Sequence, residues 1–390
     1  MIDRAWTFAV MITMAGVGCA SAPRVPSGSG DPLADRIRTF GLHDSLSAIL
    51  LAGVRDSAFP GAVVAIGTAR GALLTAAAGQ IDWKQSPAPS DSTLWDMASL
   101  TKVVGLTSAM MLLVERRQIE LDAPVARYIP EFTGSGRDAV TVRHLLTHTG
   151  GLPAWRPLYK EAEGPEEALA LAIATPLDTA PGIRMVYSDL GAIILGEVVA
   201  RASGQPFETF LRDQVFTPLG MRETMYRPPE RLRERIAPTE IDPWRQRHLR
   251  GEVHDENAFA LGGVSSHAGL FSTARDLARL ARMYLSDGAL DGRRFVSAAT
   301  IDTFTAVQNP ALSHRALGWE TPNGSNSAGR LMSARSFGHT GFTGTSFWVD
   351  RERGVFVILL SNRVNPTREH RGITAVRTAV ADAAMRAVLR

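Results

Sequence analysis

Short apolar stretches lie near both ends of the chain and have the length of β-strands. Residues 61–69 (GAVVAIGTA) and 72–79 (ALLTAAAG) flank Arg70 and Gly71, so we expect a hairpin with a tight turn. Three further stretches are expected to form consecutive antiparallel strands near the other end: 337–342, 345–350 and 354–361.

The chain between these strands is mostly helical by pattern over about 99–290, with Pro/Gly loops such as 149–153 and 227–230. Helical apolar faces are also expected at both ends: at Leu33, Ile37, Phe40, Leu46, Ile49 and Leu50, and at Ile373, Val376, Val380, Ala384 and Val388. The pattern predicts an α+β fold. One antiparallel sheet is built from both chain ends and flanked by helices, and a mostly helical lobe is inserted in the middle. A site is expected in the cleft between the two lobes.

The N-terminal segment is typical of an exported protein. Arg4 precedes 14 uncharged residues, 5–18, and small residues before the single cysteine, Cys19, resemble a bacterial lipoprotein cleavage site. We therefore predict a signal peptide at 1–18, a flexible tether at 19–32 and a globular domain at 33–390. Lipidation of Cys19 would anchor the protein in the cell envelope, facing the periplasm. The alternatives are simple secretion, with Cys19 discarded, and a retained anchor.

Composition and charge narrow the function classes. The chain has 390 residues, of which 45% are hydrophobic, enough for a sizeable core. Its net charge is 42 − 39 = +3 with both signs interspersed, so we expect no nucleic-acid partner. One cysteine permits no intrachain disulfide and no cysteine-rich metal site. His144 and His148 have a metal-ligand spacing, but we expect helix-end capping and packing from them, and neither metal nor cofactor.

Ser99 and Lys102 are the first candidate chemical pair. Three residues apart on a helix they share one face, so the amine can approach the hydroxyl. The residues after Lys102 are almost wholly apolar, and burial of this lysine is expected to lower its pKa and make it a usable base. A helix N-terminus also offers free N–H groups to a developing oxyanion. The alternative is an N-cap serine beside a surface lysine.

Two further elements carry candidate chemistry. Tyr187 precedes the apolar stretch 190–196, and a tyrosine near an ammonium can be held as phenolate and shuttle a serine proton. Alone, it is also consistent with a packing residue. His339, Thr340 and Gly341 lie on a predicted strand, and such a strand can bring its backbone close to a ligand and pair with it. The alternative is a turn into the next strand.

Taken together, residues 99–102, 187–189 and 339–341 resemble the ordered motifs S-x-x-K, Y-x-N and K/H-T/S-G. These belong to the serine β-lactamase and penicillin-binding protein superfamily, here in its class C β-lactamase-like, D-alanyl-D-alanine carboxypeptidase-like branch. The resemblance covers roughly residues 35–390 and agrees with the two-lobed fold. Three further stretches are also similar to this branch: 144–153, 251–258 and 262–273.

The resemblance implies a role for each matching residue. Ser99 would be the acylated nucleophile, and Lys102 and Tyr187 its proton-transfer partners. The backbone N–H groups of Ser99 and Phe342 would form the oxyanion hole. The implied substrate-binding residues are Asp189, His339, Thr340, Gly341 and Phe342.

Two positions depart from the family pattern. Asp189 stands where Asn is usual, and a carboxylate cannot donate the hydrogen bonds of an amide. His339 stands where Lys is commoner in β-lactamases, and it would carry a full charge only at mildly acidic pH. Thr340 and His339 would face the carboxylate or ester part of a substrate.

The resulting functional hypothesis is a cell-envelope serine hydrolase that forms an acyl-enzyme with D-Ala-D-Ala-type peptides or β-lactams. The expected partners are therefore a small-molecule or peptidoglycan-peptide substrate and a membrane, reached through the lipid anchor. Two alternatives stay open: a carboxylesterase on the same scaffold, and a non-catalytic lipid-anchored binding protein.

Overall fold

The computed structural model describes residues 1, 32–39 and 41–390. The predicted lipidation site, Cys19, lies outside the described residues. So do nearly all of the predicted signal peptide and tether, and Phe40 of the early helical pattern.

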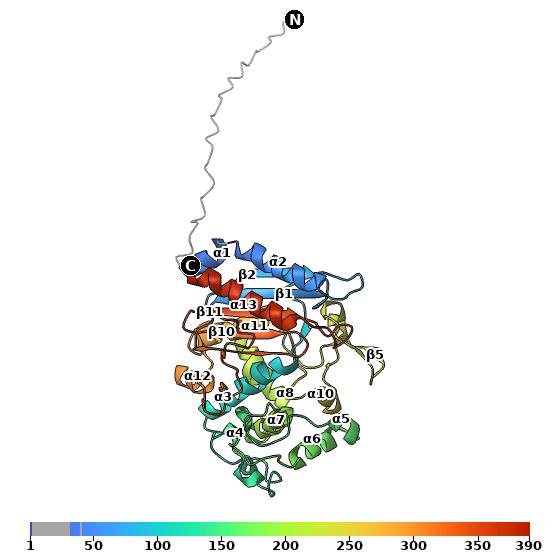
Figure 1. The fold of residues 1–390 in the computed structure, drawn as a ribbon, viewed down its shortest axis with the longest axis vertical. Helices are drawn as coiled ribbons and strands as arrows, with labels where there is room; N and C mark the ends of the chain where they lie inside the picture. The colour runs from blue at the N-terminus through green and yellow to red at the C-terminus, as the bar shows by residue number, and fades with distance from the viewer. Residues whose placement is uncertain (2–31, 40) are drawn as a thin grey trace.

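The centre of the fold is a five-stranded antiparallel sheet with the strand order β2-β1-β11-β10-β9 (Figure 1). Its strands are β1 (Gly61–Thr68), β2 (Gly71–Gly79), β9 (Ser336–Thr340), β10 (Ser346–Asp350) and β11 (Val355–Ser361). The two chain ends meet where β1 pairs with β11, with Val63 opposite Leu360. The predicted sheet built from both ends is therefore confirmed, and so is the α+β class.

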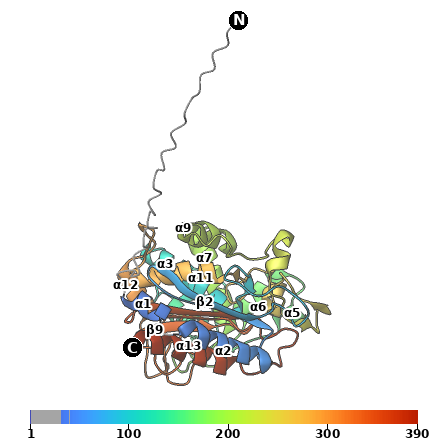
Figure 2. The same ribbon diagram turned by 90° about the horizontal axis from the view of Figure 1, so that it is seen from above.

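Helices cover both faces of this sheet (Figure 2). One face carries α1 (Pro32–Thr39), α2 (Leu42–Arg55) and α13 (Ile373–Leu389), and the other carries α11 (Ala274–Leu285). The inner strands β1 and β11 are buried along their whole length because both faces of the sheet are covered. The edge strand β2 buries few of its residues.

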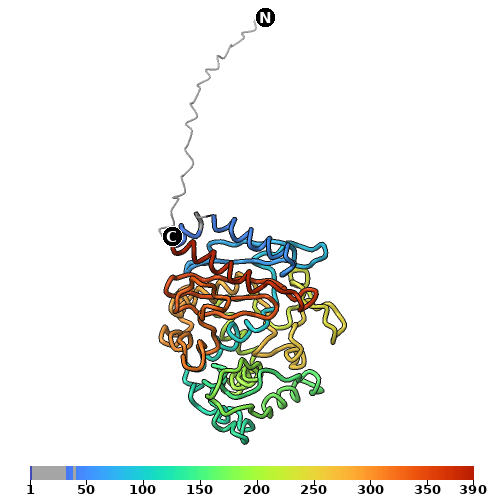
Figure 3. The backbone as a smooth tube through the Cα atoms, in the orientation of Figure 1, coloured from blue at the N-terminus to red at the C-terminus, as the bar shows by residue number. Residues whose placement is uncertain are grey.

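The chain between β2 and β9 forms the inserted lobe, which lies below the sheet in the view of Figure 3. Its helices are α3 (Ser108–Glu115), α4 (Val142–Leu146), α5 (Leu158–Glu161), α6 (Pro165–Ala174), α7 (Asp189–Ser203), α8 (Phe207–Phe210), α9 (Thr217–Leu219), α10 (Glu256–Ala260) and α12 (Ala298–Thr305). Shorter helical turns are η3 (Val125–Arg127), η4 (Arg137–Ala139), η5 (Leu211–Phe216) and η6 (Glu230–Arg235). Two-residue strands pair as β3 (Trp95–Asp96) with β6 (Phe271–Ser272), β4 (Ile241–Asp242) with β5 (Arg247–His248), and β7 (Ala289–Leu290) with β8 (Arg293–Arg294).

The helical segment Ala98–Glu115 runs through the core. Among the described residues it is the one helix long and apolar enough to cross a membrane, but 83% of it is buried inside the protein. Burial on all sides explains its apolar composition, because a helix that is hydrophobic all round needs partners all round. We therefore interpret it as a core helix.

Candidate active site

Ser99 sits in a tight turn that the buried carboxylate of Asp96 holds in place. The turn η1 (Ala98–Leu100) begins at Ala98, whose φ of 44° lies in the left-handed region. One oxygen of Asp96 accepts the Ala98 N–H at 2.8 Å and the other accepts the His254 N–H at 2.7 Å. A non-glycine residue persists in this conformation only where its surroundings impose it. These two hydrogen bonds impose it, and they present Ser99 at the cleft.

Lys102 lies at the start of η2 (Lys102–Thr107), and its ammonium has three acceptors. Its Nζ is 3.2 Å from Ser99 Oγ, 3.0 Å from the His267 carbonyl oxygen and 2.7 Å from Asp189 Oδ1. An ammonium has three N–H donors and no lone pair, so Lys102 in this form can donate to these groups but cannot accept a proton.

The pKa of Lys102 differs from the sequence-based expectation. Burial alone would lower it, but the charge of Asp189, with Tyr187, more than offsets burial and raises the pKa above its ordinary value. The expectation of a pKa lowered by burial is therefore wrong. Lys102 is a cation at neutral pH because a carboxylate from α7 lies beside it.

Tyr187 lies against the same ammonium. Its ring centroid is 5.0 Å from Lys102 Nζ and 4.6 Å from the His148 ring centroid. Its buried hydroxyl is near Lys102 and Ser99 but forms no hydrogen bond of ordinary geometry with a described residue. Burial raises the pKa of Tyr187, and the charge of Lys102 only partly offsets this. The resting side chain is a phenol, whereas the sequence suggested a phenolate.

His339 is buried on β9 as a neutral imidazole. Its Nδ1 lies 2.8 Å from the Thr340 carbonyl oxygen, to which it donates, and its Nε2 accepts from Arg315 at 3.3 Å. Burial first, then the charge of Arg315, lowers the pKa of His339 well below its ordinary value. The expected charge on His339 at mildly acidic pH is thus wrong. Arg315 supplies the positive charge here, and it also binds Glu320 at 3.1 Å.

The loop after β9 is fastened to the nucleophile turn. Thr343 Oγ1 donates to the Asp96 carbonyl at 2.7 Å, and Thr345 Oγ1 donates to the Met97 carbonyl at 3.2 Å. A Cβ on Gly341 would lie 2.4 Å from the Met97 oxygen, so only glycine allows this approach.

Phe342 follows at the tip of this loop. None of the backbone hydrogen bonds described for residues 41–390 uses the N–H of Ser99 or of Phe342. The predicted oxyanion-hole donors are therefore unoccupied by the protein. The ring of Phe342 is stacked on His254, with centroids 5.7 Å apart, and lies 4.3 Å from the guanidinium carbon of Arg363.

Two cavities meet at Ser99, Tyr187 and Phe342, which line both of them. The first, of about 450 Å³, is basic, and its lining includes Arg315, Glu320, His339, Thr340, Gly341, Arg363, Arg371 and Arg377. The second, of about 320 Å³, is aromatic and mixed in charge, and its lining includes Trp155, Tyr159, Asp189, His254, Asp255, Glu256 and Arg368. The sequence-predicted residues Ser99, Tyr187, Asp189, His339, Thr340, Gly341 and Phe342 thus border one cleft, with Lys102 buried beneath Ser99.

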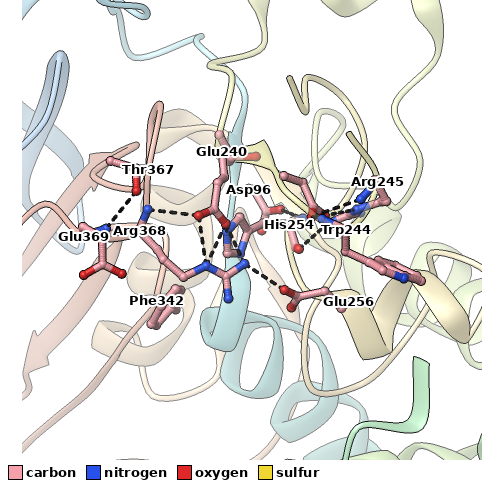
Figure 4. Close-up of polar contacts among 12 residues, drawn as sticks. Asp96, Glu240, Trp244, Arg245, His254, Glu256, Phe342, Thr367, Arg368 and Glu369 are labelled. Atoms are coloured by element: carbon pink, nitrogen blue, oxygen red, sulfur yellow. Dashed lines mark hydrogen bonds and ion pairs between the residues drawn. The ribbon is translucent and has the colours of Figure 1, made fainter. Parts of the chain in front are cut away.

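A charged network forms the wall of the second cavity (Figure 4). Glu240 lies 2.9 Å from His254 Nε2 and 2.8 Å from Arg368 Nε, and Arg368 also binds Glu256 at 2.8 Å. Burial would raise the pKa of Glu240, but His254 and Arg368 lower it to about 2. The charges of Glu240, Glu256 and Arg368 are thus paired with one another.

The segment that supplies the His267 carbonyl has its own support. Ser265 Oγ is 2.7 Å from His267 Nδ1, and His267 Nε2 is 2.9 Å from Asp255. Burial would raise the pKa of Asp255, but His267 lowers it below its ordinary value. Sequence reasoning assigned no role to His267, although the stretch 262–273 was part of the family resemblance.

His144 and His148 act as expected, in capping and packing. The His144 side chain accepts the Thr141 N–H at 3.2 Å and closes a capping box at the start of α4. His148 packs on Tyr187 and accepts the Ser188 N–H at 3.1 Å. In the part of the chain that the structure describes, no group of three or more His, Cys, Asp or Glu is placed to hold a metal ion.

Comparisons with known proteins find similar sequences and similar folds. A family model described as Beta-lactamase matches residues 46–382. A protein of Escherichia coli (strain K12) described as "Putative D-alanyl-D-alanine carboxypeptidase" is 31% identical over 317 residues, 73% of this chain and 72% of the relative. An "N-acetylmuramyl-L-alanine amidase" of Bacillus subtilis (strain 168) is 32% identical over 304 residues, 70% of this chain and 68% of the relative. The crystal structure of a penicillin-binding protein homologue from Caulobacter crescentus superposes with a TM-score of 0.73 at 21% identity, covering 89% of this chain and 97% of that one.

The contact between Gly341 and Met97 predicts the effect of Gly341→Ala. The added Cβ would push the loop away from Ser99. For any ester that the wild-type protein hydrolyses, we therefore expect kcat to fall at least tenfold, and we expect Tm to fall by a few degrees. Gly164→Ala is the matched control, because its Cβ would meet nothing within 4 Å. Steady-state kinetics and calorimetry test this; unchanged kcat in Gly341→Ala would show that the close approach does not matter for turnover.

Proposed function

The chain belongs to the beta-lactamase family, and we propose that it cleaves D-alanyl-D-alanine-type peptides through an acyl-enzyme on Ser99. One observation carries the proposal: Ser99 lies where a basic cavity meets an aromatic one. A peptide with a free C-terminal carboxylate matches this polarity, with the carboxylate in the basic half and the acyl chain in the other. The carboxypeptidase name of a relative that matches 73% of the chain supports the same substrate class.

The acceptors around Lys102 favour Tyr187 as the group that moves the proton. An ammonium with three acceptors cannot take the Ser99 proton. The Tyr187 oxygen is adjacent and has no ordinary hydrogen bond. We infer that Lys102 acts electrostatically, by stabilising the negative charge that develops on the Tyr187 oxygen.

Acylation then balances without an external base. In one relay, Tyr187 gives its proton to the leaving nitrogen as the C–N bond breaks. The phenolate oxygen that this leaves, stabilised by Lys102, takes the Ser99 proton as Ser99 Oγ bonds to the substrate carbonyl carbon. The carbonyl oxygen takes negative charge between the N–H groups of Ser99 and Phe342. Water reverses these steps, releasing the acid and restoring Ser99.

The first test concerns Ser99. Ser99→Ala is expected to lose turnover by several orders of magnitude while remaining folded, with Ser325→Ala, an exposed loop serine, as control. Three substrates separate the functions: an acyl-D-Ala-D-Ala peptide, a fluorescent penicillin and p-nitrophenyl butyrate. Peptide cleavage with a stable penicillin adduct on Ser99 supports the proposal. Rapid loss of the adduct would indicate a β-lactamase, and ester hydrolysis alone an esterase. An adduct on another serine, or no turnover at all, would overturn the assignment.

The second test concerns Asp189. Its charge raises the pKa of both Lys102 and Tyr187, so Asp189→Asn should lower both and ease transfer of the serine proton. An asparagine also donates the hydrogen bonds that an amide substrate can use. We expect kcat/KM for the peptide or nitrocefin to rise about tenfold relative to kcat/KM for p-nitrophenyl butyrate. The pH profile of kcat/KM should also gain an alkaline limb below pH 10.5, because Lys102 begins to lose its proton there. An equal loss on all substrates would mean that Asp189 itself accepts a proton.

We also propose that the protein is a cell-envelope lipoprotein anchored through Cys19. The proposal rests on the sequence around Cys19 and is compatible with a peptidoglycan-derived substrate. Expressed with its own leader in a bacterium, the wild-type protein should fractionate with membranes, and Cys19→Ser should release or mislocalise it. A wild-type protein found wholly in the soluble periplasmic fraction would contradict lipidation.

A further inference from the structure

The basic cavity beside Ser99 holds more positive charge than one carboxylate would balance. Its lining includes Arg315, Arg363, Arg371 and Arg377 but a single carboxylate, Glu320. Glu320 forms an ion pair with Arg315 at 3.1 Å. The formal charge of these five side chains is 4 − 1 = +3.

Arg377 is buried without an anion. One of its terminal nitrogens donates to the carbonyl oxygens of Gly341 and Thr345, at 2.7 and 2.8 Å. Its buried Nε has no hydrogen-bond partner among the described residues. Burial and the charge of Arg363 lower the pKa of Arg377 to about 9. A guanidinium in this state gains strongly from a nearby carboxylate.

Arg363, like Arg377, donates to backbone carbonyl oxygens. It donates to the carbonyl oxygens of Phe342 at 2.7 Å, Arg368 at 3.0 Å and His370 at 3.2 Å, and no carboxylate pairs with it among the described residues. The Nε2 of His370, on the cavity wall, is also buried without a partner. Arg363 and Arg377, neither of which pairs with a carboxylate among the described residues, therefore line one space of about 450 Å³, which is within the size range of sites for whole small molecules.

We propose that this cavity selects a leaving group with two carboxylates, a D-dicarboxylic residue such as D-glutamate in place of the terminal D-alanine. This inference rests on the proposed function and adds the specificity of its leaving-group side. The terminal carboxylate balances one arginine, and the side-chain carboxylate balances a second. The Ser99 chemistry is unchanged: the same C–N bond breaks, and the dicarboxylic amine leaves with the proton from Tyr187.

The test uses three peptides that share one acyl-D-Ala group and end in D-Glu, D-Gln or D-Ala. D-Gln has nearly the shape of D-Glu without its charge. The wild-type protein is expected to cleave the D-Glu peptide with a kcat/KM at least about tenfold above that of the D-Gln peptide, which corresponds to about 1.4 kcal/mol. The preference should shrink at high salt because part of it is electrostatic.

Two arginine variants localise the effect. Arg371 is at the exposed rim, and its one ion-pair partner among the described residues is the exposed Glu369, at 3.4 Å. Arg371→Gln should lower the D-Glu to D-Gln ratio several-fold. Arg212→Gln is the matched control, because Arg212 is also exposed, pairs with Asp213 at 2.7 Å and borders neither cavity at Ser99. It should leave the ratio and the basal turnover unchanged.

The outcomes separate this inference from the proposed function. Cleavage of the D-Ala peptide with no preference for D-Glu over D-Gln overturns the inference alone. Failure to cleave any of the three peptides overturns the proposed function. Calorimetric binding to Ser99→Ala gives a readout independent of turnover, and equal affinity for the D-Glu and D-Gln peptides would also overturn the inference.

Discussion

The ammonium of Lys102 is the one buried cation on which the rest of the site depends. Burying a charge is costly unless it is paired and hydrogen-bonded, and removal of one partner leaves the others with an uncompensated charge. The acceptors of Lys102 come from three separate segments: the Ser99 turn, the carbonyl of His267 and the start of α7 at Asp189. Its hydrogen bonds therefore hold the nucleophile, a loop and a lobe helix in one arrangement. The supporting pairs around it, such as Asp255 with His267, fix the positions of those acceptors.

The sheet fixes the other side of the nucleophile. β9 is an edge strand, and only part of its free edge is covered, where Gly338 exchanges two backbone hydrogen bonds with Glu320. The rest of the edge, at Thr340, borders the basic cavity. The loop after β9 is hydrogen-bonded to the backbone of Asp96 and Met97, which ties this edge to the nucleophile turn. An extended substrate can add to such an edge and reach Ser99 in register.

Much of this arrangement could be predicted from the sequence, because it depends on local patterns. The strands carry short apolar runs bounded by turn residues, and Ser99, Tyr187 and His339 lie in recognisable motifs. The electrostatics could not be predicted, because they depend on distances between distant segments. The sign of the Lys102 pKa shift is decided by Asp189, 87 positions away in the sequence, at 2.7 Å. The chain has 42 lysines and arginines, and no periodicity or motif distinguishes Arg315, Arg363 and Arg377 from the rest. The two-residue strands are too short for any alternation to show.

Phe342 is the residue through which the proposed mechanism links turnover to selectivity on both sides of the cleft. Its ring lies between His254 and Arg363, and the residue lines both the basic cavity and the aromatic one. A change in either wall that tilts this ring also moves the backbone N–H of Phe342, because both belong to one loop fastened to the Ser99 turn. Under the proposed mechanism, affinity for the leaving group and stabilisation of the transition state are not independent quantities, because both depend on the position of this single residue.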